Sequence, residues 1–232
     1  MLSVVVNTIA ILIGGGVGLL VKKGIPERFS NAIMVGLGLV VLYIGVSGSL
    51  QGQNPIILVI SMAVGVAIGT ALRIEERLNT LGKLLEAKVS KGKSDGKTSI
   101  AQGFVSSSLL FCVGAMAIVG SLSSGLTGDH SIIFTKATID LIASIFLTVS
   151  LGAGVLFSAV SVFVYQGAIV LLARLLRPLL ESSSMVAEIN CIGSLIIIAL
   201  AIKMLGLKKI KVADFLPAIF IAPLVYLIVG LF

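Results

Sequence analysis

The stretch that decides the fold of this chain runs from Phe111 to Gly167 and reads FCVGAMAIVGSLSSGLTGDHSIIFTKATIDLIASIFLTVSLGAGVLFSAVSVFVYQG. It consists of long apolar runs that are rich in Gly, Ala, Ser and Thr. Its charged or basic side chains are few: Asp129, His130, Lys136 and Asp140. Lys136 and Asp140 lie four residues apart within an apolar run. An ionisable group in a membrane span is costly unless it faces protein or water, so this pair marks a candidate functional site.

The composition of the whole chain is that of an integral membrane protein. Of its 232 residues 57% are hydrophobic and 12% are charged, whereas a soluble domain carries about 25% charged residues. The mean hydropathy is +1.18. The apolar residues form runs of about 20, which is the length of a helix that crosses a bilayer. Barrel strands would be about ten residues long and would alternate in polarity. The sequence therefore predicts an all-α, polytopic helical bundle in a lipid bilayer.

Eight apolar segments predict about eight transmembrane helices within one integral membrane domain, residues 1–232. The segments are Leu2–Val21, Asn31–Leu50, Pro55–Leu72, Ile100–Leu122, Ile133–Leu151, Val155–Leu172, Ala187–Met204 and Phe215–Phe232. Residues 1–72 hold three spans, residues 73–99 form a cytoplasmic amphipathic helix and linker, and residues 100–232 hold five spans. The first segment lacks a basic leader and a cleavage site of small residues, so we expect it to be a retained span.

The basic residues predict the orientation of these spans. They gather in the loops after the first, third and seventh segments, and short basic loops favour the cytoplasmic side. With eight spans both termini then lie outside. The net charge of +7 is explained by this orientation, so we expect no nucleic-acid partner. Arg174 and Arg177 fall on the outer side and disagree with the pattern. A re-entrant hairpin at Ile133–Leu151 or Val155–Leu172 would change the count.

The loop after the third segment is the longest. Residues 73–88 place Ile74, Leu78, Leu81, Leu84 and Leu85 on one helical face and charges on the other. This pattern predicts an amphipathic helix that lies on the inner membrane surface or on the bundle. A solvated linker follows it. The fourth and eighth segments end in similar letters, AMAIVG and PLVYLIVG, which is compatible with a four-plus-four internal repeat.

Glycines are expected to set the helix packing. Gly14 with Gly18, and Gly65 with Gly69, form pairs that let helices approach closely. Such faces favour tight packing within the bundle or a homodimer, and the alternative is unwound backbone that faces a solute. The sequence LGAGV at residues 151–155 predicts a break or turn. The full set of predicted packing or backbone glycines is Gly14, Gly18, Gly65, Gly69, Gly114, Gly120, Gly152 and Gly154.

Polar stripes supply the candidate binding residues. Lys136, Asp140, Ser144 and Thr148 recur at four-residue steps and share one helical face. Asp140 lies roughly 10 Å inside a span that starts at Ile133. Two interpretations stay open: an ion pair that seals the bundle, or a carboxylate that lines a polar cavity and binds a cation, a proton or a polar solute. Neighbouring runs add the other candidates: Ser158, Ser161, Tyr165, Gln166 and Cys112.

Other polar residues are expected to play structural roles. Asn7 and Asn190 each enter an apolar run, His130 is expected to be a solvated loop residue, and Asp214 is expected to cap or begin the last helix. Cys112 and Cys191 are isolated thiols, which do not form a metal site. The sequence contains no HExxH, GxSxG or phosphate-loop motif. We therefore expect neither enzymatic activity nor a cofactor or metal.

Several blocks resemble the YdfK/YqgA family of uncharacterised bacterial membrane proteins. They are FCVGAMAIVGSLSSGLTGD, K-x-x-x-D, LGAGV and YQG, with GGGVGLLVKKGIPERF near the start and KIKVADFLPAIF near the end. The resemblance covers essentially the whole chain and implies a protein of the bacterial cytoplasmic membrane. It assigns no catalytic or binding role. The positions that match the family are Cys112, Gly114, Gly120, Lys136, Asp140, Gly152, Gly154, Tyr165, Gln166, Gly167 and Pro217.

The leading hypothesis is a secondary transporter or a channel-like protein for a small solute or ion. Asp140 would bind the solute or the coupling ion, Lys136 would tune it, and LGAGV would interrupt the backbone at the site. The alternative is a non-transporting scaffold or regulatory protein that docks a partner on the helix at residues 73–88. A cavity that reaches Asp140 favours transport, and a dry, closed bundle favours a scaffold.

Overall fold

The computed structural model describes residues 1–22, 24, 26–78, 80, 100–113, 115–173 and 182–229. All regular structure in these ranges is helical, which confirms the all-α prediction. The helices are α1 Leu2–Lys22, α2 Glu27–Ser49, α3 Pro55–Ala71, α5 Ile100–Cys112, α6 Ala115–Leu126, α7 Ser131–Leu151, α8 Gly154–Leu171, α10 Ser183–Met204, the 3-10 helix η1 Val212–Phe215 and α11 Pro217–Val229.

The helices form a bundle of the kind expected for a polytopic membrane protein. Within the described ranges, six helical stretches are long and apolar enough to cross a membrane: α1, α2, α7, α8, α10 and η1 with α11. The pair α5 and α6 would make a seventh span, bent by 60°. Helix α3 is apolar but has only 17 residues. The described residues of each of the eight predicted segments are therefore mainly helical, and six or seven of the segments have the length of a span.

The turn predicted at LGAGV (residues 151–155) is present between α7 and α8, but the chain also has an interruption that the sequence did not indicate. Helices α7 and α8 are each continuous, so neither forms a re-entrant hairpin. They are joined by a tight turn in which Gly152 has a φ of 79°, a conformation that favours glycine. The additional interruption falls between Cys112 and Ala115, inside the predicted span Ile100–Leu122. Apolar and small residues continue through this break, so hydropathy does not reveal it.

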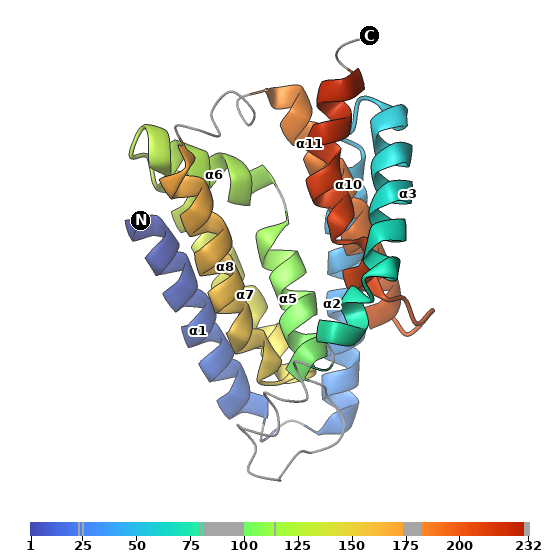
Figure 1. Ribbon diagram of the computed structural model, residues 1–232. Helices are drawn as coiled ribbons and strands as arrows, with labels where there is room; N and C mark the ends of the chain where they lie inside the picture. Colours follow the sequence, from blue (N-terminus) through green and yellow to red (C-terminus); the bar gives the residue numbers. More distant parts are fainter. Residues whose placement is uncertain are drawn as a thin grey trace.

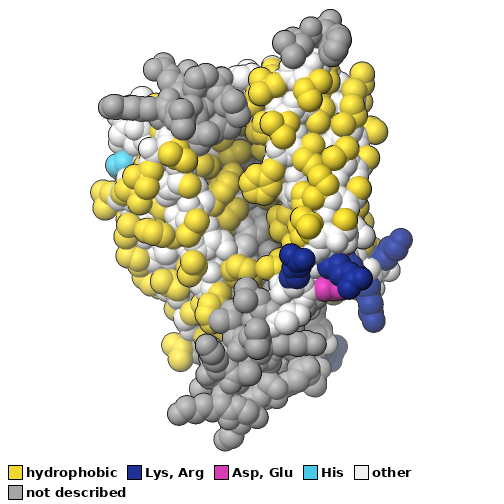
Figure 2. Space-filling view, viewed as in Figure 1, with side chains coloured by type: hydrophobic (Ala, Val, Ile, Leu, Met, Phe, Trp, Pro, Cys, Tyr) yellow, Lys and Arg dark blue, Asp and Glu magenta, His cyan; other side chains and the backbone are white. Residues whose placement is uncertain are grey.

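The chain runs up and down through the bundle (Figure 1). The ends of α1, α3 and α10, which precede the three basic loops, lie at one end. The last turn of α11 lies at the opposite end, and the N-terminus lies at the left of the bundle, above the end of α1 (Figure 1). The orientation of the two termini and the side of the bundle that faces the cytoplasm stay predictions. Figure 2 shows lysine and arginine side chains gathered below a broad apolar surface, as a membrane orientation requires.

Glycines bring α1 against α7 and α3 against the η1–α11 segment. A Cβ atom at Gly14 would overlap the Ser144 hydroxyl and the Leu141 carbonyl. At Gly69 it would overlap the backbone of Asp214. Small residues at these contacts let the backbones approach closely.

The two glycine pairs, Gly14 with Gly18 and Gly65 with Gly69, thus contact helices of the same chain. A homodimer, which was the alternative to packing within the bundle, would need a different face. The four-plus-four repeat also stays a prediction.

The remaining predicted glycines have separate surroundings. Gly120 on α6 faces the side chains of Ile132 and Ile133 at the start of α7. Gly154 packs against the backbone of Ile100 and Phe104, so the α7–α8 turn lies beside the start of α5. Gly114 lies outside the described residues, as do Arg174, Arg177 and most of the predicted amphipathic helix at residues 73–88.

The described start of that helix is held to the bundle by ionic contacts. Glu75 pairs with Lys203 of α10 at 2.7 Å, and Glu76 pairs with Lys211 at 2.8 Å. The Glu75 N–H donates to Asp214 Oδ1 at 2.8 Å. Asp214 lies in the first turn of η1, but its carboxylate therefore caps a distant segment. The sequence pattern could not show this contact, which spans 139 positions.

Candidate functional site

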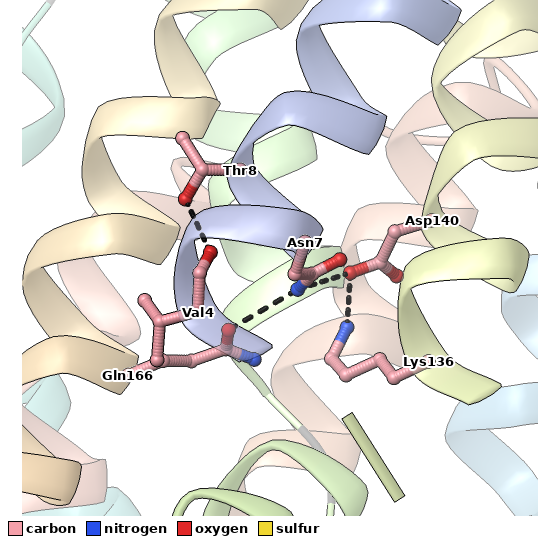
Figure 3. Close-up of polar contacts among 6 residues, drawn as sticks. All are labelled: Val4, Asn7, Thr8, Lys136, Asp140 and Gln166. Atoms are coloured by element: carbon pink, nitrogen blue, oxygen red, sulfur yellow. Dashed lines mark hydrogen bonds and ion pairs between the residues drawn. The ribbon is translucent and has the colours of Figure 1, made fainter. Parts of the chain in front are cut away.

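Four buried polar side chains meet where α1, α7 and α8 pack together (Figure 3). Lys136 and Asp140 come from α7, Asn7 from α1 and Gln166 from α8. The Lys136 Nζ atom lies 2.5 Å from Asp140 Oδ2. The Asn7 amide donates to the same Asp140 oxygen and to Gln166 Oε1, both at 3.1 Å. The amide nitrogen of Asn7 thus joins α1 to both α7 and α8. We call these four residues the α7 cluster.

The α7 cluster is almost fully shielded from solvent. Asn7 and Gln166 are 0% exposed, Asp140 is 4% exposed and Lys136 is 7% exposed. The Lys136 side chain therefore does not reach outward to the surface but stays beside its acid, and its ammonium lies 5.9 Å from the centre of the Phe111 ring. An ammonium over an aromatic face is attracted by the ring. The lysine is thus bound on two sides inside the bundle.

The charged pair borders a cavity of about 440 Å³ between α2, α5, α6, α7 and α10. Besides Lys136 and Asp140, its polar lining comes from Tyr43, Ser47, Gln51, Asn190 and Ser194. The remaining lining is mainly apolar, for example Met116 and Ile139. The two interpretations of the pair are therefore compatible, because the ion pair forms and also lines a cavity. We call this space the Asp140 cavity.

Ser144 and Thr148 continue the polar stripe of α7, but they face α1. The Ser144 hydroxyl donates to the Leu141 carbonyl at 2.8 Å. Thr148 is buried beside Gly15 and Gly18. The structure therefore places both hydroxyls in a helix contact rather than on the Asp140 cavity.

The candidates on α5 and α8 gather at a different place. Cys112, Ser161 and Tyr165 line a second cavity of about 270 Å³ between α5, α8, α10 and α11. The Ser108 hydroxyl donates to Ser161 Oγ at 3.0 Å, whereas Ser158 donates to its own helix at 2.6 Å. The predicted binding residues are thus divided between the α7 cluster, a helix contact and this smaller, largely apolar cavity.

The turn formed by LGAGV lies away from the Asp140 cavity. Gly152 follows Asp140 by twelve positions along α7, which is about 18 Å of helix. The expectation that LGAGV interrupts the backbone at the site was therefore wrong. The interruption near the cavity is the bend between α5 and α6, since Val113 and Met116 on its two sides line the cavity.

Two features of the site were not among the predicted binding residues. Asn7 was noted only as a polar residue in an apolar run, yet it bridges Asp140 and Gln166. The second feature is the wall formed by Gln51 and Asn190, where the Asn190 amide donates to Gln51 Oε1 at 2.7 Å. A usable signal was present, because polar residues four apart also occur at Ser3 with Asn7, Ser47 with Gln51, and Asn190 with Ser194.

A second buried acid, Glu188, has a structural role. It is 2% exposed, and its Oε1 accepts hydrogen bonds from the backbone N–H groups of Gln53 and Asn54 at 2.7 and 2.8 Å. These groups precede α3, where a negative charge is favoured. Cys191 beside it donates to the Ser49 carbonyl at 3.1 Å. These contacts fix the α2–α3 loop on α10.

A polar contact also joins helices at the N-terminal end of the bundle. The Ser3 hydroxyl lies 2.8 Å from the Ser124 hydroxyl, which lies 2.8 Å from His130 Nδ1. His130 is therefore half-buried and bonded rather than a fully solvated loop residue. In the described part of the chain no three His, Cys, Asp or Glu side chains lie close enough together to hold a metal ion.

Comparison with known proteins places the chain in a family. The family model described as a protein of unknown function (DUF554) matches residues 2–227. The chain is 29% identical over 236 residues to the uncharacterized membrane protein YdfK of Bacillus subtilis (strain 168), which covers 100% of this chain and 98% of that protein. It is 29% identical over 218 residues to the uncharacterized protein YqgA of Escherichia coli (strain K12), with coverage of 94% and 92%. No solved structure matches the chain significantly. The resemblance seen in the sequence is confirmed, and the chain belongs to the DUF554 family, whose function is unknown.

Proposed function

We propose that this protein is a secondary transporter or channel-like protein that moves a small solute or ion across the bacterial cytoplasmic membrane. The observation that carries the proposal is the Lys136–Asp140 pair on the wall of the Asp140 cavity. A buried ion pair adds little net stability compared with apolar side chains of similar size. A pair placed at a cavity is therefore better explained by binding than by stability alone. Asn7 and Gln166 would hold the carboxylate in place.

The bend between α5 and α6 supports the same proposal. Many secondary transporters bind their solutes beside interrupted helices near the middle of the membrane. Here Val113 and Met116, on the two sides of the bend, line the cavity that reaches Asp140. The two helices meet at an angle of 60°, and under this proposal the bend acts as a hinge at which the cavity wall opens.

Reconstitution into liposomes tests the proposal. Flux is measured with three probes: protons followed by an internal pH dye, labelled Na⁺ and a set of labelled amino acids. We expect the parent to exceed empty liposomes with at least one probe and Asp140→Asn to lose that flux. Asp129→Asn is the matched control, because Asp129 is exposed and its Oδ1 accepts the Ser131 N–H, a bond that Asn can keep. Equal flux in the parent and in Asp140→Asn would show that Asp140 is not part of a transport site.

We also propose that the basic end of the bundle faces the cytoplasm and that both termini lie outside. The support is the position of the ends of α1, α3 and α10 at one end of the molecule. Labelling of single cysteines by an impermeant maleimide in intact cells tests the orientation. A cysteine at Ser49 should react from outside and one at Lys208 should not. The reverse labelling pattern would show that the protein has the opposite orientation in the membrane.

A non-transporting scaffold is the second candidate function. The observation in its favour is the ionic contact of Glu75 and Glu76 with Lys203 and Lys211, which would hold the start of the predicted docking helix at residues 73–88 in a fixed orientation. Under this alternative, deletion of residues 81–97 abolishes the phenotype of the intact gene, whereas Asp140→Asn leaves it unchanged. Transport predicts the opposite result for Asp140→Asn.

A further inference from the structure

The Lys136–Asp140 pair has hydrogen-bonding capacity that the bundle does not use. Both recorded contacts of Asp140 converge on Oδ2, so Oδ1 accepts no hydrogen bond from the described residues. The Lys136 ammonium has three N–H donors, and one of them is directed to Asp140. Both side chains line the Asp140 cavity. The pair that lines the cavity therefore keeps one carboxylate oxygen and two ammonium N–H donors without a hydrogen-bond partner among the described residues.

Charge balance restricts what this wall can bind. Lys136 and Asp140 are the charged side chains among the residues that line the cavity, and together they are neutral. A ligand with a net charge would bring an uncompensated charge into a site of low dielectric, which is unfavourable. A ligand that carries one positive and one negative group adds no net charge. Its ammonium can meet Asp140 Oδ1, and its carboxylate can meet the free donors of Lys136.

The rest of the lining suits the remainder of such a ligand. The cavity volume of about 440 Å³ lies in the usual range for small-molecule sites. Ile44, Met116 and Ile139 offer apolar surface to a side group, and Ser47 and Ser194 offer hydroxyls. A small site of this kind fixes its ligand through a few polar groups and accommodates the rest through apolar contacts.

From this geometry we propose that the Asp140 cavity binds a small zwitterion of the α-amino-acid type. The ammonium of the ligand pairs with Asp140 and its carboxylate pairs with Lys136, so that the two ligand charges replace part of the contact between the protein charges. The proposal deepens the proposed function, on which it rests, by naming the class of solute. It excludes a simple cation or a simple carboxylate as the favoured ligand.

Equilibrium binding to the purified protein tests the proposal without any need for flux. The probes are labelled L-alanine and L-leucine. Competitors of similar size that lack one charge are propionate, which has no ammonium, and isopropylamine, which has no carboxylate. We expect one or both amino acids to bind and the two competitors to be at least tenfold weaker. Absence of amino-acid binding, or competition by propionate or isopropylamine at equal strength, would overturn the proposal.

Variants then locate the binding. Asp140→Asn and Lys136→Gln should each weaken binding at least tenfold, while Asp129→Asn should not change it. Ala143→Leu tests the cavity without altering charge, since Ala143 lines it. Added volume there should weaken L-leucine binding more than L-alanine binding. Unchanged affinity for both amino acids in Ala143→Leu and in a folded Asp140→Asn would place the binding elsewhere and end the proposal.

The two levels of the hypothesis can fail separately. If amino acids bind in a manner that depends on Asp140 but no flux is seen in liposomes, the zwitterion site is supported and the transport proposal is rejected. Flux of protons or Na⁺ that depends on Asp140, with no amino-acid binding, keeps transport and removes the zwitterion.

Discussion

Two ionic clusters in this molecule have similar geometry and different surroundings. The pairs are 2.5 Å long for Lys136–Asp140, 2.7 Å for Lys203–Glu75 and 2.8 Å for Lys211–Glu76. The side chains of the first pair are 8% and 6% exposed, whereas those of the last are 60% and 52% exposed. Solvent screens an exposed pair and makes its contribution small. A buried pair has lost its hydration, so each charge depends on the other.

The two clusters also differ in what they connect. Lys136 and Asp140 are neighbours on one helix, and this pair does not itself hold distant segments together. We call the pairs Lys203–Glu75 and Lys211–Glu76 the basic end. Their partners lie 128 and 135 positions apart in the sequence, so these pairs fasten the segment after α3 to the α10–α11 region. The pairs at the basic end therefore hold the fold together, whereas the buried pair lines a cavity, which is why we propose a binding site there.

The strongest test of this comparison is to remove one charge from the buried pair. Lys136→Met should destabilise the protein by about 3–5 kcal/mol, because Asp140 is left as a buried charge without its partner. The double variant Lys136→Met/Asp140→Leu should recover most of this loss, since no charge remains. Unfolding of the purified proteins in the same detergent measures both. If Lys136→Met were as stable as the double variant, burial of the Asp140 carboxylate would not depend on its pairing with Lys136.

A change that moves α1 away from α7 should weaken the contacts of the buried α7 cluster and leave the exposed pairs at the basic end unchanged. Gly14→Ala places a methyl group against the Leu141 carbonyl, and overpacking of this kind costs about 1–3 kcal/mol. Gly16→Ala is the matched control, because a Cβ there meets no atom within 4 Å. We expect weaker amino-acid binding only in Gly14→Ala, since Asn7 on α1 would shift from Asp140. Equal stability of the two variants would contradict the close α1–α7 contact.

Glu75→Gln tests the half-buried part of the basic end. The change keeps the size of the side chain but weakens its contacts with Lys203 and the Ala213 N–H, which lie at 2.7 and 2.9 Å. We expect a loss of about 1 kcal/mol, as for a partly screened charged hydrogen bond. Binding at the Asp140 cavity should stay unchanged. A loss as large as that of Lys136→Met would mean that the two clusters do not differ in kind.

The sequence was sufficient for the features that depend on local order. Run length predicted the helices, because bilayer thickness fixes how long a span must be. Four-residue spacing predicted that Lys136 and Asp140 share a face, because helix geometry fixes that relation. The place of the pair within an apolar run predicted that it faces protein or water, but not that Lys136 stays buried beside its acid.

Long-range contacts were beyond the reach of the sequence pattern. Asn7 bonds to Asp140 across 133 positions, and Asn190 bonds to Gln51 across 139 positions. Periodicity says which face a residue occupies but not which helix covers that face. The bend between α5 and α6 was missed for a related reason, since its residues are as apolar as those of a straight span. For the same reason Ser144 and Thr148 were grouped with Asp140, although α1 covers them.

The exposed Glu76–Lys211 pair should give the smallest effect, and the effect should depend on pH and salt. The hydrogen bond and charge of Lys211 lower the pKa of Glu76 below its ordinary 4.5, and Glu76 raises the pKa of Lys211 above its ordinary 10.5. The contribution of Glu76 to stability is therefore complete above pH 4.5 and is lost as the pH falls through its lowered pKa. The contribution of Lys211 is complete below pH 10.5 and is lost as the pH rises through its raised pKa.

Thermal unfolding of the parent and of Glu76→Gln measures this dependence. At neutral pH and low salt the parent should melt slightly higher, and the two curves should converge in acid, where Glu76 is protonated. They should also converge in about 1 M salt, where the screening length is about 3 Å. The gap between the parent and Lys136→Met should persist in the same salt, because the buried pair is shielded from solvent ions. If the difference in melting temperature between the parent and Glu76→Gln changed neither with salt nor in acid, this pair would be shielded from solvent as well. The contrast between the two clusters would then disappear.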